Sequence, residues 1–372
     1  MSLRILHITV VRELTTGQLT QLCHETKAAR DLDNTVWTTL AYQVKDSPEQ
    51  FVHRLPWFFR PVFLRNLFAW VWLIWNARKY DYVLLRHMTF DPFAAVFARW
   101  VPNRVSVHHA REINELKLIQ CNWKGQAASS LERWTGRIGV RNAKAILGVT
   151  GEIRDYELDV HSPAKNIPSH VYPNGIRVDD IDVLEDQRPK KDIEIAFMCG
   201  TFSPWHGLDI LLDQFEDYET TATLDVSITL HLIGRLSLEQ MEQVARIQEK
   251  NIIHYVKVHG SLARKAYRFV LARCHIGLSS LAISRQGLTE AATLKVRELL
   301  ALGVPVYSGH KDTAIPDDFP WYAHGSGDLD EIFQYAKGVA RVARTEVRER
   351  SRPLVEKKKW MEEAASFLEE ID

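Results

Sequence analysis

The sequence predicts an α/β protein built from two doubly wound, Rossmann-like domains. Short apolar runs alternate with segments of helical periodicity along most of the chain, a pattern typical of parallel sheets with helices on both faces. The polar stretch LEDQRPKK at 184–191 interrupts this alternation, which then begins again, and we interpret it as a linker. The 372 residues are enough for two domains of ordinary size. We expect the two domains to face a central cleft, with ligands bound beyond the carboxyl ends of the strands.

In the first half of the chain, apolar runs bounded by turns predict strands, because parallel strands buried on both faces read as continuous apolar segments. We expect these strands at 4–10, 35–41, 82–85, 104–108 and 145–149. Apolar residues at helical spacing predict helices between them. These helices are expected at 18–29, 62–77, 92–100 and 129–142.

The second half repeats the same alternation. Strands are expected at 193–198, 228–233, 253–258, 276–279 and 304–307. Helices are expected at 206–214, 237–249, 263–272, 293–302, 328–337 and 344–368. We therefore predict an N-terminal domain at 1–183, a C-terminal domain at 184–352, and a final helix at 353–372 that crosses back to the N-terminal domain.

Composition excludes several classes of protein. Lys plus Arg and Asp plus Glu both total 47, so the overall charge does not indicate a nucleic-acid binder. The cysteines are scattered without a CxxC pair, which argues against a zinc site or a disulfide framework and for buried thiols in a reducing cytoplasm (Cys23, Cys121, Cys199 and Cys274). The first residues lack a signal-peptide pattern, and no apolar run reaches the roughly 18 residues of a membrane span. We expect a cytoplasmic protein.

Residues 51–80 form a basic, aromatic segment with no acidic residue, although 51–150 as a whole holds 15 basic and 5 acidic residues. A helix of this kind is typical of proteins that lie on an anionic membrane surface. The alternative is a core helix whose aromatic residues pack on a sheet. On the membrane interpretation, the contacts with a membrane or acceptor would come from Arg60, Arg65, Arg78 and Lys79.

The segment SLAISRQGLTEAATLKVRELLALGVP at 280–305 contains the clearest candidate site. A strand is expected to end near residue 280 and a helix to begin near Thr293, whose first turn offers free N–H groups and the positive end of a dipole. Lys295 adds a cation to this anion site. Glu298 is expected about 7 Å further along the helix axis, where the ribose attached to a diphosphate bound at the helix start would lie beside it. A carboxylate can accept two hydrogen bonds from a ribose diol.

Glu290 and Glu298, followed by LLALGVPV, resemble the donor-site signature of retaining GT-B-fold glycosyltransferases, in particular glycosyltransferase family four. Three further stretches resemble the family in the same order: YPNGIRVD at 172–179, GTFSPWHGLDILL at 200–212, and the segment 258–280. The resemblance covers about 170–310, and the N-terminal half is similar mainly in layout. It implies a GT-B fold, with an N-terminal domain that binds the acceptor and a C-terminal domain that binds a nucleotide-sugar donor.

The resemblance also implies an activity. The enzyme would transfer a hexose with retention from a nucleoside diphosphate sugar. The basic, aromatic segment 51–80 suggests a glycan or lipid-linked acceptor, as in cell-envelope polysaccharide biosynthesis. Neither a metal ion nor a cofactor is expected, and the protein would lie in the cytoplasm or on the inner face of the membrane. Two alternatives stay open: a nucleotide-sugar epimerase of the same fold and a non-catalytic sugar-nucleotide-binding subunit.

The resemblance assigns roles to single residues. Glu298 would bind the ribose and Glu290 the hydroxyls of the donor sugar. Gly17 would approach the diphosphate from the other domain, although this chain has Thr16-Gly17 where the family has two glycines. His109 would lie near the reacting sugar carbon, with His108 as the competing assignment. The amides of Thr293 and Leu294 would face the diphosphate. Apart from the resemblance, His206, Arg235 and Lys295 are further candidates for donor binding; the alternatives are a helix cap for His206 and a surface position for Arg235.

The chain departs from the family at two positions. Family members have Arg just after the first glycine of the second domain and Lys before the glycine of the next helix, whereas this chain has Thr201 and His206. A departing diphosphate needs positive charge, which Lys295, Arg285 or Arg264 would have to supply.

Two further patterns have alternative interpretations. Arg111 and Glu112, just after the histidine pair, would bind a sugar or stand as exposed loop charges. The DLD triplets at 31–33 and 328–330 mimic a metal-binding DxD motif, but both lie at helix ends, where acidic residues stabilise helices. We interpret them as helix-end charges.

Overall fold

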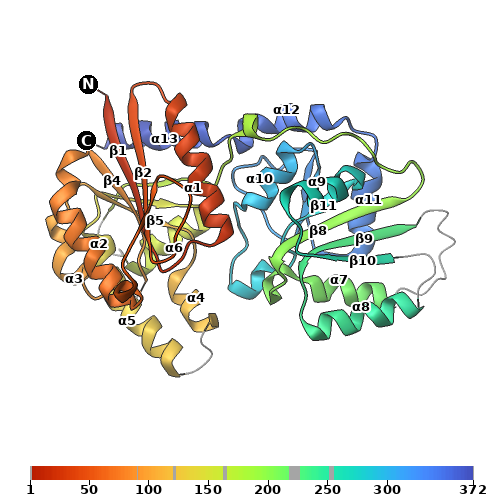
Figure 1. The fold of residues 1–372 in the computed structure, drawn as a ribbon, viewed down its shortest axis with the longest axis horizontal. Coiled ribbons are helices and arrows are strands. Elements are labelled where there is room, and N and C mark those ends of the chain that lie inside the picture. Colours follow the sequence, from red (N-terminus) through yellow and green to blue (C-terminus); the bar gives the residue numbers. More distant parts are fainter. Residues whose placement is uncertain are drawn as a thin grey trace. The chain divides into compact units, whose positions relative to one another are not determined.

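The computed structural model describes residues 2–89, 91–119, 123–161, 166–217, 227–250 and 255–371. The chain forms two compact units (Figure 1). The first unit runs to Arg177 and takes in the chain again from Glu356 onward, and the second spans Val178–Val355. The first unit therefore ends six residues before the predicted boundary at 183.

The first unit contains a seven-stranded parallel sheet with the order β3-β2-β1-β4-β5-β6-β7. All five predicted strands are confirmed. The edge strands β3 and β7 were not predicted, because each has only three residues and lacks an apolar run. The bounds are β1 Leu3–Val10, β2 Thr35–Gln43, β3 Val52–Arg54, β4 Tyr82–Arg86, β5 Arg104–His108, β6 Ala145–Gly148 and β7 Ser169–Val171.

Helices cover both faces of this sheet, because successive side chains of a strand point to opposite faces. Leu6, Ile8 and Val10 of β1 pack against α2, whereas His7 of β1 contacts Glu25 of α1 on the other face. Figure 1 shows α2 and α3 on one side of the sheet and α1 on the other. The predictions missed α4 and α6. The bounds are α1 Thr16–Ala28, α2 Val62–Asn76, α3 Ala94–Phe97, α4 Glu112–Ile119, α5 Trp123–Arg141 and α6 Gly151–His161.

The second unit contains a six-stranded parallel sheet with the order β10-β9-β8-β11-β12-β13. Its five predicted strands are confirmed, except that residues 253 and 254 of the third lie outside the described residues. The short edge strand β13 was not predicted. The bounds are β8 Ile193–Thr201, β9 Ile228–Arg235, β10 Tyr255–Gly260, β11 Ile276–Leu278, β12 Val306–Ser308 and β13 Tyr322–His324.

Both sheets have the strand order of a Rossmann fold, which confirms the predicted fold class. In each, the first strand lies between the second and the fourth, so the order reverses between β1 and β4 and between β8 and β11. Ligands of such sheets bind at the carboxyl ends of the strands at this switch point. In Figure 1, α7 and α8 lie on one side of the second sheet and α9 and α10 on the other. The helices are α7 Leu208–Asp217, α8 Leu238–Lys250, α9 Arg264–Arg273, α10 Leu294–Ala301 and α11 Leu329–Val339.

The predicted helix at 344–368 is two helices, α12 Arg344–Val355 and α13 Lys357–Glu370. The backbone of Glu356 is extended, with ψ at 124°. Glu356 bridges to Ile176, and the amide of Lys357 donates to the carbonyl of Ile176 at 2.8 Å. The single-helix prediction is wrong because this backbone pairing ends one helix before the next begins. α13 then packs on α1 and β7 of the first unit.

Candidate functional site

The candidate donor site lies at the switch point of the second sheet, where the loops after β8 and β11 meet. The amide of Leu281 donates to the carbonyl of His206 at 2.9 Å. Gly207 adopts a left-handed φ of 73°, and a Cβ there would lie 3.0 Å from the Cβ of Leu281. A glycine at this position therefore allows the two loops to approach closely.

Thr293 caps α10, so the helix begins where the sequence predicted. Its backbone is extended, and its Oγ1 accepts a hydrogen bond from the amide of Val296 at 3.4 Å. The amides at the start of a helix have no acceptor inside the helix, so those of Leu294 and Lys295 are placed for an anion. The predicted anion site therefore has the expected local geometry.

Lys295 brings a cation to the carboxyl end of β8. Its Nζ lies 3.1 Å from Cys199 Sγ and 5.3 Å from the centre of the Phe197 ring. Both partners belong to β8, so the ammonium lies between this strand and the first turn of α10. Lys295 is the predicted diphosphate cation that the structure places at this helix start.

His206 lies close enough to Lys295 to feel its charge, but the ring is neutral. Burial and then the charge of Lys295 lower the pKa of His206 to about 4. Its Nδ1 accepts a hydrogen bond from the amide of Ser203 at 2.9 Å. The proton of the neutral ring is therefore on Nε2. His206 can donate one hydrogen bond to a phosphate but supplies no positive charge at neutral pH.

Glu298 is half-buried on α10 and is held from a neighbouring helix. The hydroxyl of Tyr267 on α9 donates to Glu298 Oε1. Burial, followed by the charge of Glu298, raises the pKa of Tyr267 well above its ordinary value, so the phenol keeps its proton. Sequence reasoning missed Tyr267, because a partner 31 residues away leaves no spacing signal.

Glu290 lies in an extended segment before α10, in the loop as expected. It forms a β-bridge with Lys311, and the amide of Ala291 donates to the carbonyl of Lys311 at 3.0 Å. The buried guanidinium of Arg297 on α10 pairs with the carboxylate of Asp312. This pair ties α10 to the segment that holds Glu290, and the sequence analysis did not identify it.

The structure does not place the other basic candidates at the start of α10, where Lys295 lies. Arg285 forms two hydrogen bonds with Asp209, at 2.9 and 2.6 Å, and donates to the carbonyl of Pro204 at 2.6 Å. It therefore braces the loop of His206, and its charge is already paired. Arg264 is exposed at the start of α9. Thr201 and Arg235 are exposed register partners at the ends of β8 and β9.

The first unit holds Gly17 at the carboxyl edge of its own sheet, in the first turn of α1. Thr15 and Gln18 form a capping box around the helix start. Gly17 is exposed, and a Cβ built on it would meet no atom within 4 Å among the described residues. The backbone at the start of α1 is therefore accessible at Gly17, because no side chain of the described residues covers it there.

The adjacent residues His108 and His109 lie in different environments. His108 ends β5 and is fully buried, with Nε2 2.8 Å from Ser106 Oγ and Nδ1 3.2 Å from Glu112 Oε1. His109 is half-buried, and burial, followed by the charge of Arg86, holds its pKa well below the ordinary value. Burial also lowers the pKa of His108, so the two imidazoles differ in exposure, and His109 is the less buried one.

The neighbours of this pair are not exposed loop charges. Glu112 is buried with His108. Arg111 pairs with Glu152 at 2.7 Å and lies over the ring of Tyr156. Neither side chain is in the exposed state that one interpretation of the sequence expected.

The basic, aromatic segment has a buried face and an exposed face. One face of α2 is core, with Ala69, Trp70 and Leu73 buried. Trp57 and Trp75 are 72% and 79% exposed, and the other exposed apolar residues of the segment are Phe58, Phe63, Leu64 and Val71. Arg60, Arg78 and Lys79 are also exposed. Among the described residues, no helix is both long and apolar enough to cross a membrane.

Arg65 differs from the other basic residues of this segment. It is half-buried and donates to the carbonyls of Phe59 and Arg60. It therefore stabilises the turn before α2, rather than facing outward as the membrane interpretation expected.

The triplet at 328–330 has the helix-end role that we expected, whereas Asp31 of the other triplet forms an ion pair with a distant residue. Asp328 caps α11, and its Oδ1 accepts from the amides of Asp330 and Glu331 at 3.0 and 3.1 Å. Asp31 pairs with Arg177 at 3.0 Å.

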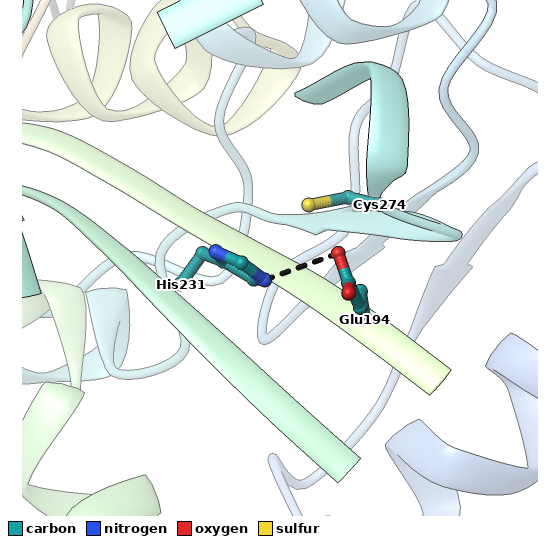
Figure 2. A group of neighbouring side chains, drawn as sticks. All are labelled: Glu194, His231 and Cys274. Carbon is teal, nitrogen blue, oxygen red and sulfur yellow. Dashed lines mark ion pairs between the residues drawn. The ribbon is translucent and has the colours of Figure 1, made fainter. Parts of the chain in front are cut away.

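A buried cluster of Glu194, His231 and Cys274 lies at the amino ends of the second sheet, away from the donor site (Figure 2). His231 Nε2 is 3.3 Å from Glu194 Oε2, and Arg273 binds both carboxylate oxygens at 2.7 and 3.1 Å. Burial alone would raise the pKa of Glu194, but His231 and Arg273 lower it to about 2. The guanidinium already neutralises the carboxylate, so we assign the cluster a structural role.

Only one of the described cysteines matches the predicted burial closely. Cys274 is buried and its pKa is raised, whereas Cys23 and Cys199 are half-buried. All three are free thiols. Cys121 lies outside the described residues.

Comparison with solved structures settles the fold. The Anabaena protein HepE, bound to UDP and glucose, superposes with a TM-score of 0.63 at 15% identity, over 99% of this chain and all of that one. The lipopolysaccharide outer core galactosyltransferase WaaB gives 0.61 at 11% identity, over 99% and 100%. The chain has the GT-B fold.

Other GT-B proteins are similar to the same extent. The E. coli trehalose-6-phosphate protein bound to UDP-2-fluoroglucose gives a TM-score of 0.60 at 12% identity, over 99% of both chains. No protein-family model matches the sequence, and no curated protein matches it. The fold is therefore shown by structure, at sequence identities that carry no assignment of activity.

Proposed function

We propose that this GT-B protein is a retaining glycosyltransferase that uses a nucleoside diphosphate sugar. The observation that carries the proposal is the arrangement on α10. Thr293 caps the helix start, Lys295 places its ammonium beside that start, and Glu298 lies further along, fixed by Tyr267. An anion site followed by a held carboxylate matches a diphosphate followed by a ribose.

Each group would have a defined task in donor binding. The amides at the start of α10 and Lys295 would bind the diphosphate, and Nε2 of His206 would donate one further hydrogen bond. Glu298 would accept hydrogen bonds from the ribose, with Tyr267 keeping its carboxylate in one orientation. Glu290 would bind hydroxyls of the donor sugar.

Catalysis in this proposal is the stabilisation of charge on a departing diphosphate. Preorganised donors and cations lower the energy of that charge, and Lys295 with the helix start would supply them without a metal ion. The acceptor hydroxyl would attack on the face from which the diphosphate leaves, and the leaving phosphate would take its proton. Neutral His109 would hydrogen-bond the sugar, because an uncharged imidazole does not oppose positive charge at the anomeric carbon.

The acceptor in this proposal is lipid-linked or borne on a membrane, as in cell-envelope glycan assembly. Exposed Trp57 and Trp75 alternate with exposed Arg60, Arg78 and Lys79 on one segment that has no acidic residue. Aromatic rings enter the headgroup region of a bilayer and basic side chains bind anionic lipids. The protein would therefore act at a membrane surface.

The first experiment is a thermal-shift panel with UDP, GDP, dTDP and ADP, because a ligand that binds the folded state raises the melting temperature. Similarity to HepE and to the E. coli protein, which were solved with UDP and UDP-2-fluoroglucose, makes UDP the expected ligand. Calorimetry on Glu298→Ala should then show binding weaker by ~1–3 kcal/mol, the value of a charged hydrogen bond. Glu249→Ala, on the exposed end of α8, is the matched control.

Product analysis separates the proposal from its alternatives. A glycosyltransferase hydrolyses donor slowly and transfers it when acceptor is added, with the anomeric configuration kept. An epimerase converts the donor alone, and a binding subunit binds donor without turnover. Unchanged nucleotide affinity in a folded Glu298→Ala variant contradicts the proposed site.

A further inference from the structure

Three histidines and three glutamates meet in the interior of the first unit, outside the proposed donor site. They come from the end of β4, the end of β5, and the helices α4, α5 and α6. Their side chains are at most 10% exposed. The six residues are His87, His108, Glu112, Glu132, Glu157 and His161.

Three of these side chains converge on one point. One ligand atom each from His108, Glu112 and Glu157 lies within 4.8 Å of the others. His108 Nδ1 is 3.2 Å from Glu112 Oε1 and 3.3 Å from Glu157 Oε2. His161 Nε2 is also 3.3 Å from Glu157 Oε2. One imidazole and two carboxylates therefore converge, and the imidazole of His161 adjoins Glu157.

The surroundings hold these groups in place. Ser106 Oγ lies 2.8 Å from Nε2 of His108, the ring nitrogen that faces away from the carboxylates. Gly136 on α5 leaves room for the other groups, because a Cβ there would lie 2.8 Å from both Glu132 Oε1 and His161 Cε1. A hydrogen bond to the distal nitrogen of a histidine is the usual support of a metal-binding imidazole.

The cluster carries more buried acceptors than the protein satisfies. Both carboxylate oxygens of Glu157, Glu112 Oε2 and both ring nitrogens of His161 are buried and make no hydrogen bond in the part of the chain that the structure describes. Buried carboxylates without partners are costly.

The contrast with the cluster in Figure 2 is informative. There, Arg273 binds the buried carboxylate of Glu194 through two hydrogen bonds. Among the described residues, the ion-pair partners of Glu112 and Glu157 are histidines alone. Within the part of the chain that the structure describes, Glu112 and Glu157 therefore lack an arginine such as the one that neutralises Glu194, and a bound cation would take its place.

We propose that His108, Glu112 and Glu157 bind one divalent transition-metal ion, with Zn²⁺ as the best match. One imidazole and two carboxylates supply three ligands, and a water molecule would complete the four-coordinate set that Zn²⁺ takes. The ion joins β5 to α4 and α6. Because His109 follows His108 directly, the ion also fixes the backbone that carries His109. The site is structural and does not depend on the proposed function.

The test uses untagged full-length protein, dialysed against Zn²⁺ or Mn²⁺, freed of unbound ion by gel filtration, and analysed by elemental mass spectrometry. We expect about one Zn²⁺ per chain, a melting temperature that falls by several degrees with a chelator, and its recovery when Zn²⁺ is returned. Co²⁺ in place of Zn²⁺ should give the visible absorption of a tetrahedral site.

The decisive variant is Glu157→Gln, which keeps the shape but removes one ligand charge. A metal site loses its ion and its chelator sensitivity in this variant, whereas Glu194→Gln, in the cluster of Figure 2, keeps both. A network that merely shares a proton is unaffected by chelator, because the Gln amide can donate to Glu112. Metal content below a tenth of an ion per chain in the wild type, together with a chelator-insensitive melting temperature, overturns the proposal.

Discussion

The ammonium of Lys357 lies 3.5 Å from Glu25 Oε2, and both side chains are fully buried in the first unit. Lys357 opens α13, and Glu25 belongs to α1. The same ammonium lies 3.8 Å from the centre of the Tyr172 ring, and Glu25 also contacts His7 at 2.6 Å. The final helix is therefore held to the first unit by a buried charge pair as well as by apolar packing.

Replacing Lys357 should destabilise the first unit strongly. Lys357→Met leaves the carboxylate of Glu25 buried without its cation, and breaking one side of a buried pair costs ~3–5 kcal/mol. The free energy of unfolding from urea denaturation measures this loss. Glu25→Gln combined with Lys357→Met should recover much of it, because no buried charge then remains.

The matched control for this substitution is the neighbouring lysine. Lys358→Met removes a pair with Glu362 that lies 3.4 Å apart on the surface of the same helix. Exposed pairs contribute about 0–1 kcal/mol, so little change is expected. Equal losses of unfolding free energy in the two variants would show that the buried pair stabilises the protein no more than the exposed pair does.

The same pair should make the protein sensitive to acid. Burial alone would raise the pKa of Glu25, but His7 and Lys357 together hold it well below the ordinary value of 4.5. Below pH 4.5 the unfolded chain binds a proton that the folded one does not, so the stabilisation is present above this pH and is lost as the pH falls. Urea denaturation between pH 5 and 3 should show that the free energy of unfolding falls more steeply with pH in the wild type than in the Glu25→Gln, Lys357→Met double variant. Parallel slopes would contradict this assignment.

The sequence predicted the buried strands well and the polar helices poorly. Strands such as β1 and β9 can be predicted from their continuous apolar runs. The helix α6 does not, because its buried face carries Ile153, Glu157 and His161, and buried polar residues erase the apolar periodicity. The helix missed for this reason contributes two residues to the cluster of the first unit.

The candidate site was predictable where it is local. The cap at Thr293 and the positions of Lys295 and Glu298 follow from the start of one helix. The hydroxyl of Tyr267 on Glu298 and the pairing of Arg285 with Asp209 depend on how distant segments pack. Such contacts have no sequence period, so only the folded structure reveals them.

Removing the hydroxyl of Tyr267 should weaken nucleotide binding without touching the nucleotide. In Tyr267→Phe, Glu298 loses a charged hydrogen bond and its fixed orientation, a loss of ~1–2 kcal/mol or a roughly 5- to 30-fold rise in the Kd for UDP. Calorimetry measures this Kd, and Tyr255→Phe, at an exposed position on β10, is the control. If both variants bind as wild type does, Tyr267 does not position Glu298.

Binding to anionic vesicles should depend on the basic residues around α2. Arg60, Arg78 and Lys79 are exposed at the two ends of an apolar stripe that includes Val71 and Trp75. Each basic residue near an anionic surface contributes about 1 kcal/mol. Neutralising all three to Gln should therefore weaken partition by roughly 100-fold at low salt.

The control for that variant carries the same change of charge elsewhere. Lys190, Lys191 and Arg341 are exposed in the second unit, and their replacement by Gln lowers the net charge equally. Partition into phosphatidylserine vesicles, followed by cosedimentation, should fall for the first triple variant and stay near wild type for the second. Trp75→Ser should also weaken binding, whereas Trp134→Ser, an exposed tryptophan on α5, should not. Equal losses of vesicle partition in both triple variants would show that the overall charge of the protein determines binding. A docking surface on α2 requires instead that the position of the basic residues determines it.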